Sequence, residues 1–211
     1  MSDIAQRSST SPFAPTEPGR RPSGVPAEAA QIALPRIAVL GGMTLGLTAL
    51  RRVAGVAAAT KVARFVNLGL VSLLAGNGIG ALLAIHPALR ELPAREFLEA
   101  EQGVTRRYAR IMSVLMPAAV VSCINVLRLT RDRRSPAFGL TVAGTANLIG
   151  MMVVTGIELP LNRKTLETSP DDVSDWVASR ERWDRFNLIR DALTVNGWAL
   201  LCLAALFERK D

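Results

Sequence analysis

Histidine is almost absent from this sequence, because His86 is the one histidine among 211 residues. Zinc, di-iron and haem sites built from several histidines are therefore excluded. The acidic residues are dispersed along the chain, so we do not expect a metal site made of carboxylates alone. The sequence also lacks a glycine-rich phosphate loop, a Ser-His-Asp arrangement and a pair of carboxylates at a fixed catalytic spacing.

Cysteine and charge are scarce as well. Cys123 and Cys202 lie within apolar runs, which favours buried free thiols over a disulfide framework. Charged residues make up 20% of the chain and hydrophobic residues 49%, with a mean hydropathy of +0.26. The charges are confined to connections between long uncharged runs, which is typical of membrane spans. The net charge of +7 comes from arginines between apolar runs, so we expect a lipid bilayer and no nucleic acid as partner.

The first 64 residues divide into two parts. Residues 1–31 are rich in Ser, Pro, Ala and Gly, and we expect a disordered tail because they cannot bury enough apolar surface to offset chain entropy. Residues 32–64 contain an apolar run, Ile37–Leu50, which ends at Arg51 and Arg52. A membrane span needs about 20 residues, so this shorter run predicts an interfacial or re-entrant helix, with a membrane crossing as the alternative.

Four longer apolar runs follow, and they predict four membrane spans. The expected fold is all-α: a membrane-spanning antiparallel four-helix bundle over 65–207, with a polar helical extension leading into the last span. The predicted spans are about 65–85, 111–127, 138–159 and 191–207.

The distribution of Lys and Arg predicts the orientation of the bundle. The N-terminal region, the link at Arg128–Arg134 and the C-terminal tail carry more of them than the other two connections, which also contain many acids. Because positive charge collects on the cytoplasmic side, we expect a multi-pass protein of the cell membrane with both termini in the cytoplasm. A homo-oligomer is compatible with this organisation.

We expect most of the polar residues that could carry chemistry to lie at one end of the bundle. The segment Gly156–Arg190 joins the third span to the fourth, and its five large polar or aromatic residues follow one another at steps of four, three, four and three. They share one helix face because residues three and four apart are neighbours on a helix. These residues are Trp176, Arg180, Trp183, Asn187 and Arg190.

Glu158 is the acid expected to lie at the edge of a span, with Arg190 at the matching depth as its partner. The pair has two interpretations: a structural salt bridge, or a general base held by Arg190 and facing a cavity. His86 ends the first span and is either an interfacial residue or a second candidate base. The asparagines in the spans either bond between helices or line a pocket; they are Asn77, Asn125, Asn147 and Asn196.

Three motifs in order resemble a known family. They are the run from Gly80 to Pro93 containing PALRELP, then IELPLNR at Ile157–Arg163, then WxxxRxRWDRFNxxR at Trp176–Arg190. In this order they resemble the DUF1772 membrane family, also called anthrone oxygenase-like, over roughly residues 65–207.

The resemblance implies a four-helix membrane bundle and, by analogy with characterised relatives, a monooxygenase of aromatic polyketide biosynthesis. Such an enzyme oxidises an anthrone to a quinone without a cofactor, using molecular oxygen as co-substrate. On this hypothesis the catalytic residues are Glu158, Arg190, Asn187 and His86, and a flat apolar substrate is bound by Asn162, Arg180, Trp183, Trp176 and Asn77. Many relatives have histidine where this chain has Asn187. The alternative function is non-catalytic binding of a lipophilic ligand or partner, with Glu158–Arg190 as a structural ion pair.

Overall fold

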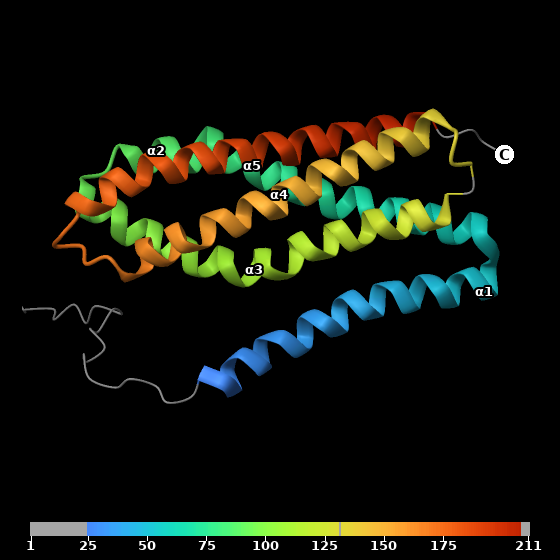
Figure 1. Cartoon of the computed structure of the whole chain (residues 1–211), viewed down its shortest axis with the longest axis horizontal. Coiled ribbons are helices and arrows are strands. Elements are labelled where there is room, and N and C mark those ends of the chain that lie inside the picture. Colours follow the sequence, from blue (N-terminus) through green and yellow to red (C-terminus); the bar gives the residue numbers. More distant parts are fainter. Residues whose placement is uncertain (1–24, 131, 208–211) are drawn as a thin grey trace, which may run out of the picture.

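The chain folds into long helices that lie side by side (Figure 1). The structure is a computed structural model, and it describes residues 25–130 and 132–207. No strand occurs within these ranges, which confirms the all-α fold class. The elements in chain order are α1 (Val25–Gly80), the π-helical turn η1 (Ala81–Ile85), α2 (His86–Arg90), α3 (Ala94–Leu129), α4 (Pro136–Glu167) and α5 (Ser174–Leu206).

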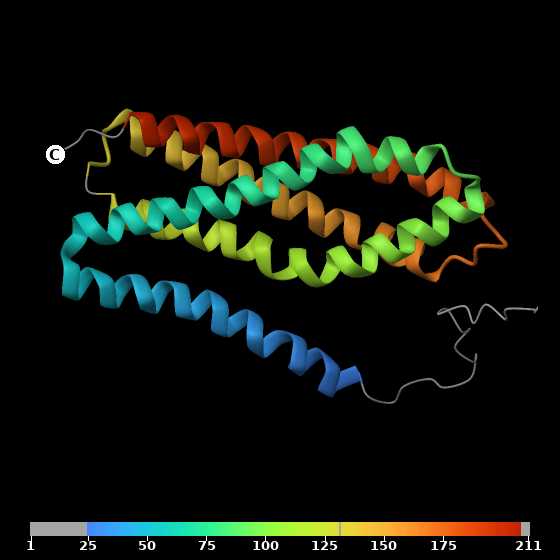
Figure 2. The same cartoon turned by 180° about the vertical axis from the view of Figure 1, so that it is seen from behind.

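Helix α1 consists of two limbs that meet at Gly55. The backbone there has φ 85° and ψ 172°, a conformation that glycine adopts without the steric cost of a Cβ atom. The first limb therefore turns back and runs beside the bundle, antiparallel to the second (Figures 1 and 2). In the described part of this limb, Thr44 Oγ1 accepts a 3.5 Å hydrogen bond from Asn125 Nδ2 of α3.

The helical start differs from the boundary predicted from the sequence. Helix α1 begins at Val25, seven residues before the expected start of the helical segment at 32. Residues 1–24 of the predicted disordered tail lie outside the described residues. The interfacial or re-entrant placement of 32–64 relative to a membrane stays a prediction.

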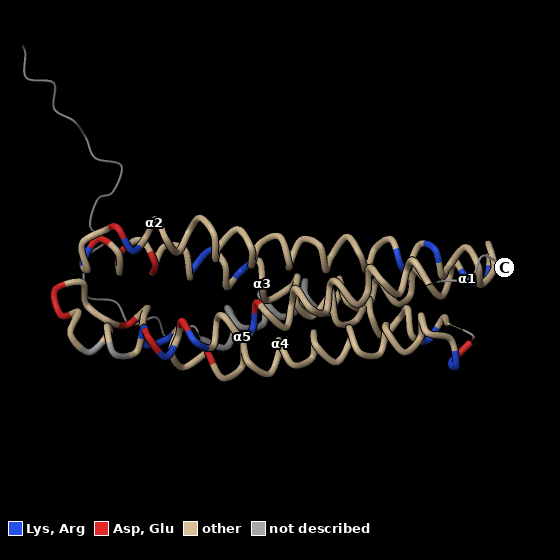
Figure 3. Tube along the Cα trace, turned by 90° about the horizontal axis from the view of Figure 1, so that it is seen from above, with Lys and Arg blue, Asp and Glu red and all other residues tan. Residues whose placement is uncertain are grey.

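Each predicted span lies within one of four helices that are long and apolar enough to cross a membrane. The architecture is that of a multi-pass membrane protein. Helix α3 has 36 residues and is about 54 Å long, whereas the bilayer core is about 30 Å thick. Its apolar part begins at Ile111, so its polar first half extends beyond the membrane. The first half of α5 forms the predicted polar extension in the same way, and charge gathers at the ends of the bundle (Figure 3).

The centre of the bundle is a buried core to which α1, α3, α4 and α5 all contribute. Val71, Met116, Leu148 and Leu201 are among its members. Helices α4 and α5 pack closely at Gly144, where an added Cβ would lie 2.8 Å from Leu201 Cγ. The close approach requires glycine because neither the Leu201 side chain nor the neighbouring backbone leaves room for a methyl group.

The span asparagines divide between the two roles left open by the sequence. Asn196 Nδ2 donates a 3.0 Å hydrogen bond to Asn147 Oδ1, joining α5 to α4, and Asn125 joins α3 to the first limb of α1. These three amides tie helices together, as amides within apolar spans do. Asn77 instead lines the cavity described next.

Candidate functional site

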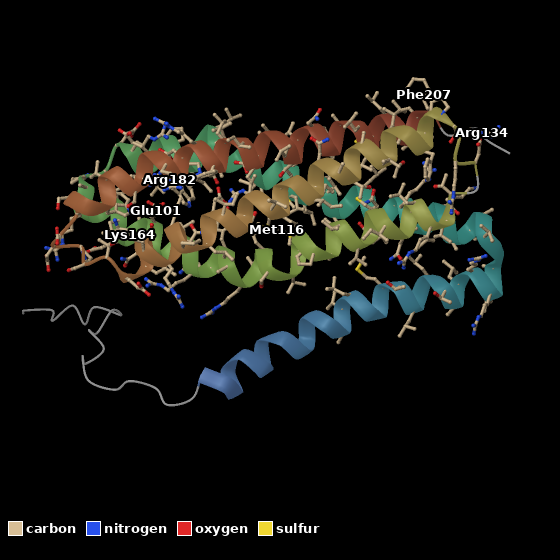
Figure 4. All side chains as sticks on the ribbon, in the orientation of Figure 1. Glu101, Met116, Arg134, Lys164, Arg182 and Phe207 are labelled. Carbon is tan, nitrogen blue, oxygen red and sulfur yellow. The ribbon has the colours of Figure 1, made fainter. Side chains whose placement is uncertain are left out.

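A large cavity opens between the helices at the end of the bundle that carries α2. Its volume is about 1180 Å³, and residues of α1, η1, α2, α3, α4 and α5 line it. Glu101 and Lys164 line its outer part near that end, and Met116 lines its inner part near the middle of the bundle (Figure 4). The cavity therefore leads from a polar rim into the apolar core, as binding sites between bundle helices commonly do.

The inner end of the cavity is rich in methionine. Four of the six methionines of the chain line it: Met112, Met116, Met151 and Met152. Methionine side chains are flexible and polarisable, and they make favourable contacts with aromatic rings. This end can adapt its shape to an apolar, aromatic ligand.

Arg190 stands between two carboxylates at the wall of the cavity. Its Nη1 donates to Glu158 Oε2 over 2.9 Å, and its Nη2 donates to Asp191 Oδ1 over 3.3 Å. The ion pair predicted between Glu158 and Arg190 is thus present. We call Arg190, Glu158 and Asp191 the trio. With all three groups ionised, the trio carries one excess negative charge.

Asn187 connects this trio to His86. Its Oδ1 accepts a hydrogen bond from Arg190 Nη2, which orients its amide nitrogen toward Asp191 Oδ2 and His86 Nε2, each at 3.4 Å. Since the amide nitrogen can only donate, His86 Nε2 accepts, and the proton of the neutral imidazole lies on Nδ1. His86 Nδ1 is buried and has no partner among the described residues. An unpaired buried donor is rare, and this atom is not exposed on the cavity surface.

An aromatic wall adjoins this network. The rings of His86 and Trp183 meet edge to face, with their centroids 5.4 Å apart. Trp183 Nε1 donates a 2.7 Å hydrogen bond to Asn162 Oδ1, which fixes the indole against α4. All three residues line the cavity. The wall is rigid, and it presents flat surfaces to an aromatic ligand.

Arg180 forms a second buried cluster above this wall. It makes ion pairs with Glu101 of α3 and, over 3.0 Å, with Asp184 of α5. Its guanidinium also lies over the rings of Phe97 and Trp183, at 4.3 and 5.1 Å from their centroids. Such cation–π contacts are strongest when they are removed from water. The cluster links α3 to α5 at the outer end of the cavity.

Glu101 lies ten residues before the apolar part of α3. Burial raises the pKa of its carboxyl group from the ordinary value of 4.5 to about 7, although Arg180 acts in the opposite direction. Desolvation therefore outweighs the attraction of the guanidinium. The ion pair between Glu101 and Arg180 therefore contains a carboxyl group that titrates near neutral pH.

The structure brings most of the predicted site residues together. His86, Asn187, Arg190, Asn162, Trp183 and Asn77 all line one cavity. Three others do not line it, for different reasons. Glu158 is fully buried on the far side of Arg190, so it does not face the cavity as the base hypothesis required. Arg180 lies behind Glu101, and Trp176 packs against Phe97 with 2% exposure, away from both the cavity and a lipid interface.

Two residues of the site were missed by the sequence reasoning. Asp191 lines the cavity and bonds to both Arg190 and Asn187, but from the sequence it was simply the first residue of the predicted last span. Its position four residues after Asn187 was the available signal. Glu101 gave no comparable signal, because its partner Arg180 lies 79 positions away in the chain.

Comparisons with protein-family models, curated proteins and solved structures found no match.

Proposed function

We propose that this protein is a membrane oxygenase that oxidises a flat, lipophilic phenolic compound, of the anthrone type, to a quinone without a bound cofactor. One observation carries the proposal: a cavity reaches from the polar end of the bundle into its core, with a charged hydrogen-bond network and an aromatic wall along one side. The three motifs that resemble the anthrone oxygenase-like family provide the residues of this wall.

The proposed reaction needs no metal or flavin. An anthrone carries a C–H group between two aromatic rings and opposite a ketone, so its conjugate base is a delocalised, electron-rich anion. This anion gives one electron to O₂, and the radical pair combines through a C–O bond to form a peroxide anion. The protonated base returns its proton to this anion, which gives the hydroperoxide. Loss of water, with cleavage of the O–O bond and removal of the second C–H proton, leaves the new carbonyl. One anthrone and one O₂ thus become one anthraquinone and one H₂O.

The protein has to supply a base, donors for the developing oxyanion and a dry slot. We assign the base to Asp191 rather than Glu158, because Asp191 is the carboxylate of the trio that lines the cavity. The Arg190 guanidinium, which lines the cavity, is the donor for the oxyanion. Trp183 and the methionines hold the rings.

The test is the oxidation rate of the purified, reconstituted protein with anthrone, measured by O₂ uptake and quinone absorbance. Removing a general base typically costs a factor of about 10²–10⁴, so Asp191→Asn should lose at least about 100-fold in rate. Glu99→Gln makes the same chemical change in an exposed pair with Arg95 and should leave the rate unchanged. An Asp191→Asn protein that is folded and oxidises anthrone at the wild-type rate would exclude this assignment.

The second candidate is a non-catalytic protein that binds a lipophilic ligand in the same cavity. The position of Glu158 favours it, since a fully buried carboxylate behind Arg190 ties α4 to α5 as a structural ion pair would. Under this function anthrone or a similar compound binds and protects the protein against unfolding, but O₂ uptake stays at the rate without protein.

A further inference from the structure

The two ends of the bundle differ in their charge. At the end that carries the cavity, the segments 86–110 and 158–191 contain eleven Lys and Arg and twelve Asp and Glu. At the opposite end, the segments 51–64 and 128–134 contain seven described Lys and Arg and one acid, Asp132. Figure 3 shows the mixture of both signs at the first end and the prevalence of basic residues at the second.

The basic residues of the second end come together through the turn at Gly55. The turn of α1 at Gly55 and the link between α3 and α4 lie at the same end of the bundle, which Arg134 marks in Figure 4. We call the exposed cations gathered here the basic end; they are Arg51, Arg52, Lys61, Arg128, Arg133 and Arg134.

These cations have no acidic partner within the described part of the chain. At the cavity end, by contrast, ion pairs such as Arg90–Asp184 and Arg180–Glu101 neutralise part of the charge. Asp132, the one acid in the described parts of these two segments, accepts a hydrogen bond from the backbone N–H of Arg134. The net positive charge of the basic end therefore attracts anions from outside the protein.

We infer that the basic end binds the headgroups of anionic phospholipids, in the leaflet that this end faces. The geometry fits that partner, because the cations flank the apolar parts of α1, α3 and α4. Basic residues next to membrane spans bind anionic lipids in this way, and their attraction falls off within a Debye length. Because the cytoplasmic leaflet carries the anionic lipids, the inference also places the basic end on the cytoplasmic side. It does not depend on the proposed oxidation.

The test is the selectivity of the reconstituted protein for lipid headgroups. Spin-labelled phosphatidylglycerol and phosphatidylcholine are compared by electron paramagnetic resonance, which gives their relative association constant with the protein. One variant replaces Arg51, Arg52, Arg133 and Arg134 by Gln. The matched control replaces four exposed arginines of the other end that have no ion pair within the described residues: Arg106, Arg107, Arg110 and Arg182.

The wild type should prefer the anionic lipid severalfold at low salt. The four-residue variant of the basic end should lose most of this preference, whereas the control variant should keep it. Raising the salt concentration should weaken the preference of the wild type, since exposed charges are screened. The inference is overturned if both variants lose the preference equally, if neither loses it, or if the wild type shows none. Anthrone oxidation is measured separately, so its absence would leave this result standing.

Discussion

The Glu158–Arg190 pair allows a quantitative prediction of stability. Glu158 is fully buried, and its Oε2 accepts the 2.9 Å hydrogen bond from Arg190, whose side chain is 23% exposed. Glu158→Gln keeps the shape of the side chain but leaves the guanidinium with one carboxylate, Asp191, at 3.3 Å. Breaking a buried pair by removing one partner costs about 3–5 kcal/mol. Since Arg190 keeps Asp191 and Asn187, we expect the lower value, about 3 kcal/mol.

The free energy of unfolding can be measured by denaturant titration in mild detergent. The three tryptophans of the chain all lie on α5, so their fluorescence reports the separation of this helix from α4. Glu99→Gln is the matched control, because its pair with Arg95 is exposed and should contribute less than about 0.5 kcal/mol. Equal losses of less than 1 kcal/mol in both variants, on the order of a surface pair, would refute the burial argument.

Two further predictions concern packing and pH. Gly144→Ala should lower the free energy of unfolding by about 1–3 kcal/mol, because its Cβ would overlap Leu201, whereas Gly139→Ala has open space and should be neutral or stabilising. Denaturant titration measures both, and equal effects would contradict the α4–α5 contact. Glu101 should make stability depend on pH: its pKa is raised on folding, so its contribution is fully present below about pH 4.5 and is lost as the pH rises through about 7. Glu101→Gln should flatten this part of the pH profile of stability, and an unchanged profile would contradict it.

The all-α fold class and the four long apolar helices were predictable from the sequence. Long uncharged runs bounded by arginine can satisfy their backbone groups in lipid only as helices, so the four spans followed from hydropathy. The polar face of α5 was predictable from the helical spacing of Trp183, Asn187 and Arg190, which are neighbours on this helix. The Glu158–Arg190 pair was predictable because an acid at the edge of one span requires a cation at the same depth.

Features that depend on how the helices pack were not predictable. The fold-back of α1 depends on the dihedral angles of Gly55, one of 16 glycines in the chain. Which carboxylate faces the cavity depends on the rotation of α4 relative to α5, and this rotation buries Glu158 and presents Asp191. Trp176 was predicted to bind the substrate, but it packs against Phe97 because α3 covers that face of α5.

The most direct test of the central claim is O₂ uptake by the reconstituted protein in the presence of anthrone. We predict that it consumes one O₂ for each anthraquinone formed, at a rate well above the reaction without protein, and that folded Asp191→Asn protein loses at least about 100-fold of this rate. O₂ uptake by folded wild-type protein no faster than the reaction in empty membranes would contradict the claim.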